Sequence, residues 1–169
     1  MLKMIKEVKN NPGLLPKLLV IIYRFGYIIH FKIKVPIIQP LMYFVYRLAD
    51  LCIVKLLFNC DVLGSVKIGA GVKFYHPYGI IINDAAVIGK NARIRGQVTI
   101  GNKGENDLGC PTIGNNVEIG VGAKIIGNIS LGNNIKIGAN AVVTKSFPDN
   151  AILVGVPAHN VAKRKKTLE

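Results

Sequence analysis

The side chains best suited to acid–base chemistry in this sequence are its three histidines, His30, His76 and His159. Imidazole titrates near neutral pH, so a histidine can remove a proton from an attacking hydroxyl group. His30 lies in an apolar N-terminal stretch and His159 lies near the C-terminus, whereas His76 lies where a sequence repeat is interrupted. His76 is therefore the candidate base, although a histidine beside a proline can equally be a structural residue.

The same residue types give little support to a metal site. A zinc site with three histidine ligands needs them to converge, and these three lie on three different kinds of segment. The cysteines Cys52, Cys60 and Cys110 are odd in number and have no CxxC spacing, which predicts neither a disulfide framework nor a zinc ribbon. We therefore expect no metal and a reducing, cytoplasmic environment.

The elements that must position these residues are predicted by a repeat that begins at residue 61. An aliphatic residue recurs every six positions, commonly followed by glycine: Ile68, Ile88, Ile94, Ile100, Ile113, Ile119, Ile125, Leu131, Ile137 and Val143. A unit of six residues is one short strand and a tight turn, and three units close one coil of a triangular solenoid. The aliphatic side chains would stack inside, while glycine and Asn115, Asn116, Asn133 and Asn134 would supply positive φ at the corners.

Two interruptions of this repeat are the places where a site could be built. The first lies between Phe74 and Ile88, around Tyr75-His76-Pro77-Tyr78-Gly79. The second lies between Ile100 and Ile113, where residues 102–110 form a polar, glycine-rich segment that predicts an extruded loop. This loop could cover a neighbouring surface that holds His76, or it could have no contact with a substrate.

The first 60 residues are apolar and basic, and predict helices over about 14–34 and 41–58. Their longest charge-free run has 12 residues, too short to span a bilayer, and no signal-peptide cleavage site is recognised. The whole chain of 169 residues has a net charge of +13, and residues 1–60 contribute +7 of it. These helices could lie on an anionic membrane surface, or pack against the rest of the protein or a sister subunit. We divide the chain into this helical region (1–60), a repeat domain (61–160) and a basic tail (161–169).

The repeat over residues 61–160 resembles the hexapeptide-repeat acyltransferases. The resemblance implies a mainly β fold, a left-handed parallel β-helix preceded by a short α-helical region. The same coil carries γ-type carbonic anhydrases and non-catalytic subunits, so the fold alone does not decide the function.

The segment from Asp61 to Ile80 is similar to the part of serine acetyltransferases that holds their catalytic dyad, an Asp fifteen residues before a His. The resemblance implies that His76 is the general base and that Asp61 orients it through the other ring nitrogen. Without the resemblance, Asp61 could simply cap the start of the first coil.

The later coils look like those in which this family binds acetyl-CoA, in a groove between the subunits of a homotrimer. The resemblance implies acetyl-CoA as the co-substrate. The candidate contacts are Gly120, Gly122, Ala123, Lys124, Gly138, Ala139 and Lys145. Small residues would let the pantetheine arm approach the backbone, and Lys145 would meet phosphates. The basic run 163–166 could also meet the phosphates or be a solvated tail.

The sequence departs from serine acetyltransferases on the acceptor side. Their Asp before the catalytic His and their later Arg-His pair correspond here to Tyr75, Gly109 and Cys110. Loss of these charged groups removes the anchors for an amino acid, so we assign Tyr75 and Cys110 to an uncharged acceptor. The chain looks closer to short O-acetyltransferases of capsule, exopolysaccharide and lipopolysaccharide pathways, whose acceptors are small-molecule or lipid-linked sugars.

Three interpretations of the function stay open. The first is an acetyl-CoA-dependent acyltransferase for a sugar hydroxyl, in the cytoplasm or at the inner face of the membrane. The second is serine O-acetyltransferase, with Arg93 or Arg95 as an anchor for the carboxylate. The third is a non-catalytic basic solenoid that binds a membrane surface. Nucleic acid is not an expected partner, because the repeat region offers no aromatic stacking platform.

Overall fold

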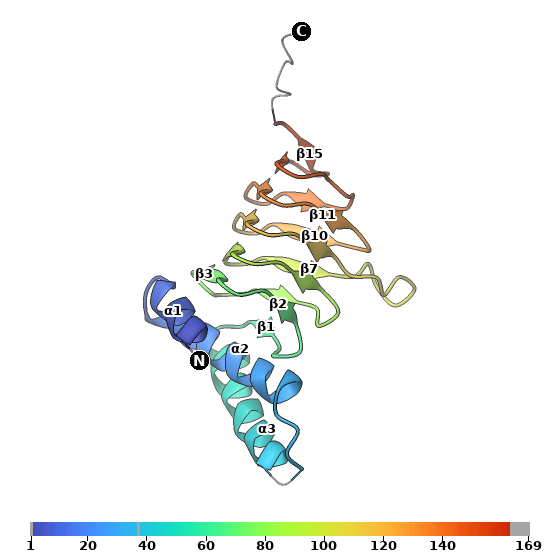
Figure 1. Ribbon diagram of the computed structural model, residues 1–169. Helices are drawn as coiled ribbons and strands as arrows, with labels where there is room; N and C mark the ends of the chain where they lie inside the picture. The colour runs from blue at the N-terminus through green and yellow to red at the C-terminus, as the bar shows by residue number, and fades with distance from the viewer. Residues whose placement is uncertain (1, 37, 163–169) are drawn as a thin grey trace.

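The structure, a computed structural model, describes residues 2–36 and 38–162 and contains a helical N-terminal region followed by a stack of coils (Figure 1). The chain passes along the stack from the first coil, beside the helices, to the last coil near the C-terminus. Most of the expected basic tail lies outside the described residues.

The helical region contains α1 (Leu2–Asn10), α2 (Leu14–Phe31) and α3 (Ile38–Ala49), and α3 continues as a π-helical segment, η1 (Asp50–Leu57). The two expected helices are confirmed as α2 and α3–η1, with ends shifted by a few residues. The sequence did not predict α1, because Glu7, the one buried residue among residues 4–10 of this helix, is polar. By length and mean hydropathy α2 could cross a membrane, but 44% of it is buried within the protein.

The remaining chain forms a left-handed parallel β-helix, as expected, with three sheets. Sheet A contains β1 (Asp61–Val62), β4 (Ile81–Ile82), β7 (Thr99–Gly101), β10 (Lys124–Ile126) and β13 (Val142–Val143), one strand from each coil. Sheet B contains β2 (Lys67–Ile68), β5 (Val87–Ile88), β8 (Thr112–Ile113) and β11 (Ser130–Leu131). Sheet C contains β3 (Lys73–Tyr75), β6 (Arg93–Arg95), β9 (Glu118–Ile119), β12 (Lys136–Ile137), β14 (Ile152–Val154) and β15 (His159–Asn160).

The core consists of the predicted aliphatic ladders. Ile68, Ile88 and Ile113 pair in register across sheet B, and all three are buried. Because side chains alternate across a strand, the residue beside each ladder position points outward. The residues that alternate with the ladder positions therefore form columns on the outer surface of each sheet, where a ligand could contact them.

Glycine follows the ladder residues because adjacent coils stack closely. A Cβ atom on Gly69, Gly89 or Gly114 would lie 2.7, 2.5 and 2.6 Å from backbone atoms of the next coil. The asparagines divide into two roles that the sequence did not separate. Asn116 and Asn134 adopt positive φ as expected and hydrogen-bond to each other through their side chains, whereas Asn115 and Asn133 do not adopt positive φ and accept hydrogen bonds from backbone N–H groups of the neighbouring coil.

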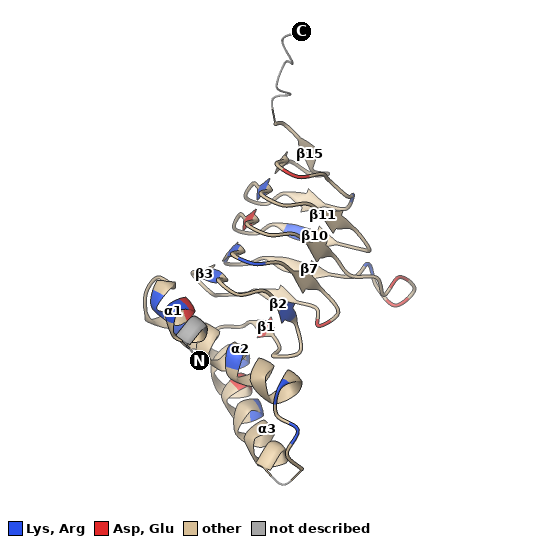
Figure 2. Cartoon of the chain, viewed as in Figure 1, with Lys and Arg blue, Asp and Glu red and all other residues tan. Residues whose placement is uncertain are grey.

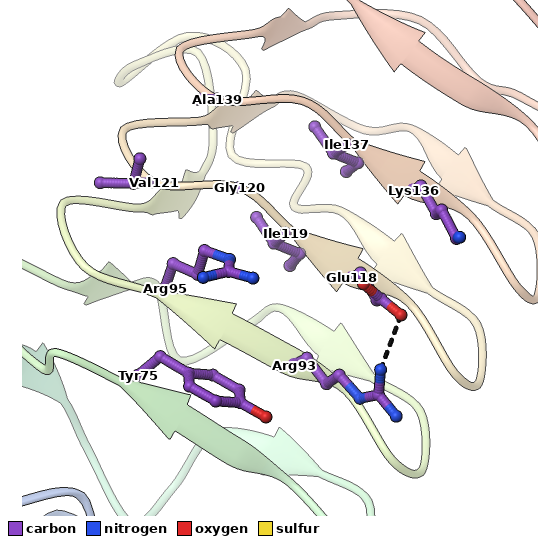
Figure 3. Close-up of a pocket in the computed structure, with 10 residues that line it drawn as sticks. All are labelled: Tyr75, Arg93, Arg95, Glu118, Ile119, Gly120, Val121, Lys136, Ile137 and Ala139. Carbon is purple, nitrogen blue, oxygen red and sulfur yellow. Dashed lines mark hydrogen bonds and ion pairs between the residues drawn. The ribbon is translucent and has the colours of Figure 1, made fainter. Parts of the chain in front are cut away.

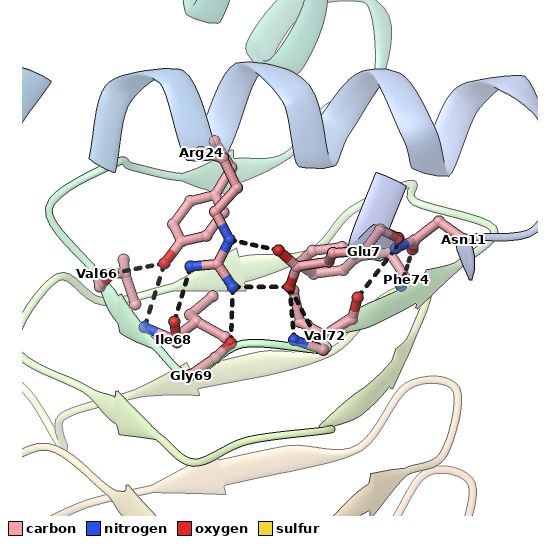
Figure 4. Close-up of polar contacts among 10 residues, drawn as sticks. Glu7, Asn11, Arg24, Val66, Ile68, Gly69, Val72 and Phe74 are labelled. Carbon is pink, nitrogen blue, oxygen red and sulfur yellow. Dashed lines mark hydrogen bonds and ion pairs between the residues drawn. The ribbon is translucent and has the colours of Figure 1, made fainter. Parts of the chain in front are cut away.

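The edge of the first coil is covered by polar side chains from the N-terminal helical region (Figure 4). Phe74 N donates to Asn11 Oδ1 at 2.8 Å, and Asn11 Nδ2 donates to Val72 O at 3.0 Å, as a neighbouring strand would. Glu7 accepts from the N–H group of Val72 and forms a two-pronged ion pair with Arg24 at 2.8 Å. Exposed strand edges favour association with other chains, so this cover fixes where the solenoid begins.

At the other end of sheet C, the chain reverses. The last strand, β15, pairs antiparallel with β14, with Val154 opposite His159. His159, expected near the C-terminus, therefore belongs to the strand that covers the last coil.

Candidate active site

The candidate base lies at a widened corner of the first coil. His76 follows β3 directly, its side chain is exposed, and its backbone is left-handed with φ of 52°. The same conformation occurs at other corners of the solenoid, among them Asn116 and Asn134. The first interruption of the repeat thus turns the imidazole out of the solenoid.

Cys60, which the sequence analysis did not assign to the site, holds this corner. Its Sγ donates to Pro77 O at 3.3 Å and accepts from Ile80 N at 3.3 Å. Burial raises the pKa of this thiol, which keeps it protonated and able to donate. Cys60 therefore fixes the backbone that immediately follows His76.

A cavity of about 320 Å³ opens beside His76. It is lined by residues 12–16, which connect α1 to α2, and by residues 75–78 of the corner. Its side chains are aliphatic, proline and tyrosine apart from the imidazole, and none of them is an ionised anchor. The sequence did not predict the contribution of residues 12–16, because they are about 60 positions from the corner in the sequence and lie beside it only in the folded chain.

Asp61 is the first residue of β1, on the same coil, but it does not contact His76 directly. The nearest cation to its carboxylate is Lys55, with Nζ 3.4 Å from Oδ1, and neither Asp61 nor His76 forms a side-chain hydrogen bond among the described residues. The contact of Cys60 with Pro77 brings the two segments together one residue away from each member of the expected dyad. Asp61 instead lines a separate cavity of about 400 Å³ on sheet A, together with Asp84.

Two of the expected acetyl-CoA contacts, Gly120 and Ala139, line a third cavity of about 480 Å³ on sheet C (Figure 3). Tyr75 lies in this cavity and also in the cavity at His76, so the two adjoin. The coil geometry already requires Gly120, because a Cβ atom there would lie 2.6 Å from Ala139 N.

The other expected donor contacts lie elsewhere. Ala123 is completely buried in the solenoid interior, so its methyl group cannot meet a ligand on the surface. Gly122 has a φ of 72° and forms a corner, and Gly138 packs against Val154. Lys124 Nζ donates to Gln97 O at 2.7 Å, and Lys145 is exposed on the last coil. The sequence pattern thus did not separate residues that serve the fold from residues that face the sheet C cavity, and the contacts of all these residues with acetyl-CoA stay a prediction.

Cys110 lies far along the chain from His76, at the end of the loop that residues 102–110 form. This loop extends away from the stack, as expected, and Lys103 pairs with Asp107 within it at 3.5 Å (Figure 1). Burial, followed by the negative charges of Asp84 and Asp107, raises the pKa of the Cys110 thiol. Within one chain Cys110 does not line the cavity at His76, so the two expected acceptor residues Tyr75 and Cys110 are not brought together.

Two arginines on sheet C stand beside the expected acceptor residue. The guanidinium of Arg95 lies 5.4 Å from the centre of the Tyr75 ring, and Arg93 pairs with Glu118 at 2.8 Å.

Nowhere in residues 2–36 and 38–162 do three His, Cys, Asp or Glu side chains form a group that could hold a metal ion.

Comparisons with known proteins agree with this fold. The family described as bacterial transferase hexapeptide (six repeats) matches residues 110–145. A protein of Escherichia coli (strain K12), described as a colanic acid biosynthesis acetyltransferase, WcaB, is 35% identical over 160 residues, which are 92% of this chain and 96% of the relative. Serine acetyltransferase from Haemophilus influenzae is 40% identical over 66% of this chain, but the match spans only 42% of that enzyme.

A solved structure extends the similarity to the helical region. The crystal structure of Neisseria gonorrhoeae serine acetyltransferase matches 99% of this chain and 68% of its own, with a TM-score of 0.74 and 29% identity. The repeat, the β-helix and the near-complete match to the E. coli relative together show that this chain is an acyltransferase and belongs to the bacterial hexapeptide-repeat acetyltransferases.

Proposed function

We propose that this protein is an acetyl-CoA-dependent O-acetyltransferase for a sugar hydroxyl of a capsule, exopolysaccharide or lipopolysaccharide precursor. The observation that carries the proposal is the cavity at His76, whose lining offers tyrosines and prolines but no charged anchor. An amino acid would need charged partners for its ammonium and carboxylate groups, whereas a sugar ring packs on aromatic and proline faces. The E. coli relative described as a colanic acid biosynthesis acetyltransferase supports this acceptor class.

His76 acts as the general base in this mechanism. Its imidazole takes the proton of the acceptor hydroxyl as that oxygen attacks the thioester carbonyl carbon. The carbon–sulfur bond then breaks, and the imidazolium gives the proton to the sulfur of the departing CoA. Asp61 stabilises the imidazolium once the bound acceptor draws the two side chains together.

The donor lies along the groove on sheet C, where Gly120 and Ala139 leave the backbone open to the pantetheine arm. In the active homotrimer a neighbouring subunit closes this groove, so each active site lies between two subunits. The residues 102–110 of that neighbour then reach the acceptor and bring Cys110 to it.

The second candidate function is serine O-acetylation, favoured by the similarity to serine acetyltransferases and by Arg95 beside Tyr75. Arg95 could bind a carboxylate. The cavity still lacks a carboxylate of its own to bind the ammonium group of serine.

Thiol release from acetyl-CoA by the purified protein tests both functions. The panel contains L-serine, free monosaccharides, nucleotide sugars and lipid-linked sugars. We expect turnover with a sugar acceptor, and a loss of about 10²- to 10⁴-fold in His76→Ala. His159→Ala, on the last strand, is the matched control and should keep full activity. Turnover with serine alone would overturn the sugar assignment, and His76→Ala with unchanged activity would overturn the assigned base.

We further propose that α3–η1 binds the inner, cytoplasmic face of a membrane that contains anionic lipids. Leu41, Phe44 and Leu48 are 67%, 66% and 53% exposed on one side of α3. Exposed basic side chains lie close by along the chain, namely Lys32 and Lys34 between α2 and α3, and Arg47 on α3. Figure 2 shows basic residues on α3 and on the segment that leads to it. A helix with this combination binds the interface between headgroups and acyl chains.

Co-sedimentation with vesicles that contain anionic lipid tests this surface. Changing Leu41, Phe44 and Leu48 to Ser should abolish most of the binding. The control changes Val87 and Ile152 to Ser, two exposed apolar residues of the β-helix. Equal binding by both variants, or binding to neutral vesicles alone, would contradict the proposal.

A further inference from the structure

The outward face of sheet C carries an unbalanced column of positive charge. Lys73, Arg93, Glu118 and Lys136 occupy equivalent positions on four successive strands, and Tyr75 lies opposite Arg95 in the neighbouring column. Strands in a sheet lie about 4.8 Å apart, and like charges directly opposite each other are destabilising. Lys73 opposite Arg93 is such a pair, so this arrangement costs stability in the free protein.

The single carboxylate of this column neutralises only one of the cations. Glu118 pairs with Arg93 at 2.8 Å. Three cations, Arg93, Arg95 and Lys136, line the sheet C cavity against this one anion. In the described part of the chain, Arg95 forms no ion pair, and its guanidinium lies against the Tyr75 ring. A local arrangement that opposes stability is expected where a ligand supplies the missing charge.

We propose that the end of this cavity beside Tyr75 binds the diphosphate group of the acceptor, with Arg95 as the principal ligand and Arg93 in support, while the pantetheine arm of the donor occupies the remainder along Gly120 and Ala139. The planar guanidinium of Arg95 matches phosphate oxygens in a two-pronged contact. Figure 3 shows Arg95 and Tyr75 on adjacent strands at the same edge of the cavity. Tyr75 borders both cavities, so a sugar can pack on its ring with a hydroxyl toward His76 and its diphosphate toward Arg95.

The position of Arg95 separates this site from the phosphates of the donor. Arg95 is one strand, about 4.8 Å, from the strand that ends beside His76. When the thioester lies at His76, the phosphates of acetyl-CoA lie beyond its long pantetheine arm, several coils further along the stack. A phosphate held by Arg95 therefore belongs to the acceptor. The proposal deepens the proposed function, since it names a sugar diphosphate as the acceptor class.

Binding of inorganic pyrophosphate, measured by isothermal titration calorimetry at constant ionic strength with saturating CoA present, tests the site without turnover. We expect Arg95→Gln to weaken binding about 10- to 100-fold, and Arg95→Lys to recover part of it. Lys67→Gln removes an exposed positive charge on sheet B and is the matched control, with affinity unchanged. The proposal is overturned if Arg95→Gln binds pyrophosphate like the unmodified protein, if Lys67→Gln weakens binding equally, or if CoA displaces pyrophosphate.

Two further ligands distinguish the sources of the diphosphate. Uridine diphosphate binding more tightly than pyrophosphate would indicate a nucleotide sugar, and farnesyl diphosphate binding more tightly would indicate a lipid-linked sugar. His76→Ala should bind pyrophosphate normally. If the unmodified protein binds pyrophosphate normally but transfers acetyl groups to no acceptor of the panel, the proposed function is contradicted and the diphosphate site still stands.

Discussion

The carboxylate of Asp61 has two candidate partners, the ammonium group of Lys55 and the imidazole of His76. Lys55 holds its carboxylate at 3.4 Å in the free protein, and the corner that carries His76 is attached to the residue before it. The spacing of Asp61 and His76 predicted the pair but not the competing lysine, because Lys55 belongs to η1 and meets Asp61 only where that segment ends beside β1.

We expect Asp61→Asn to lower kcat by about 10²-fold or more while the KM for acetyl-CoA stays the same, because only the stabilisation of the imidazolium is lost. Steady-state kinetics with the acceptor found in the panel measures this. Lys55→Met is the control, since it removes the competing partner and should preserve kcat. An Asp61→Asn enzyme with full kcat would show that Asp61 only caps the first coil.

Asp50 provides a test of stability against pH. Burial raises the pKa of its carboxyl group, opposed by Lys55 and Arg47, and its Oδ1 atom has no hydrogen-bond partner among the residues that the structure describes. A raised pKa means that the folded state disfavours ionisation, so Asp50 lowers stability as the pH rises above the pKa of the unfolded chain. We expect Asp50→Asn to raise the Tm at pH 7 more than at pH 4, as measured by thermal unfolding. A gain independent of pH would show that the charge of Asp50 has no effect on stability.

The cover of the first coil connects the helices to the site at the scale of elements. Asn11 hydrogen-bonds the backbone groups of Val72 and Phe74 at the edge of β3. The five residues that follow it, 12–16, line the cavity at His76. The repeat predicted the coils because each aliphatic residue meets an equivalent residue one coil away. It could not predict this cover, because Glu7 and Asn11 bind backbone groups more than 60 positions away.

Asn11→Ala should therefore affect both stability and acceptor binding. The change leaves the Phe74 N–H and Val72 C=O groups without partners, at a cost of about 2–4 kcal/mol in the free energy of unfolding. Displacement of residues 12–16 should also raise the KM for the acceptor more than it lowers kcat. Denaturant unfolding and kinetics measure the two effects, with the exposed neighbour Asn10→Ala as the control. If Asn11→Ala destabilises the protein but leaves the KM for the acceptor unchanged, the contacts of Asn11 do not position residues 12–16 for acceptor binding.

At the scale of the whole molecule, one chain presents the candidate residues on different surfaces. His76 and Tyr75 lie at the first corner, and Cys110 ends a loop that extends away from the stack (Figure 1). The sequence predicted each of these segments from the two interruptions in the repeat. Their separation in one chain could not be predicted, because the period fixes the stack but not the direction in which an inserted loop leaves it. The proposed trimer, with the site between subunits, would bring the two segments together.

Mixing two inactive variants tests this arrangement. One variant is His76→Ala, and the other replaces residues 103–109 with two glycines. If a site combines His76 of one chain with the loop of its neighbour, co-expression at equal levels should restore about a quarter of the sites, because each chain of a functional pair is then present with a probability of one half. If both come from one chain, no mixed trimer contains an intact site and activity stays at the level of the separate variants.

Two controls make this result decisive. Light scattering should give a mass equal to three chains of 18.4 kDa for both variants and for the mixture, since a monomer cannot complement. Changing Lys67 to Gln in both variants should leave the recovered activity unchanged, because Lys67 lies on sheet B, outside the groove. Recovery with trimers of the expected mass would place the loop in the neighbour's site, whereas trimers without recovery would show that His76 and the loop act within one chain.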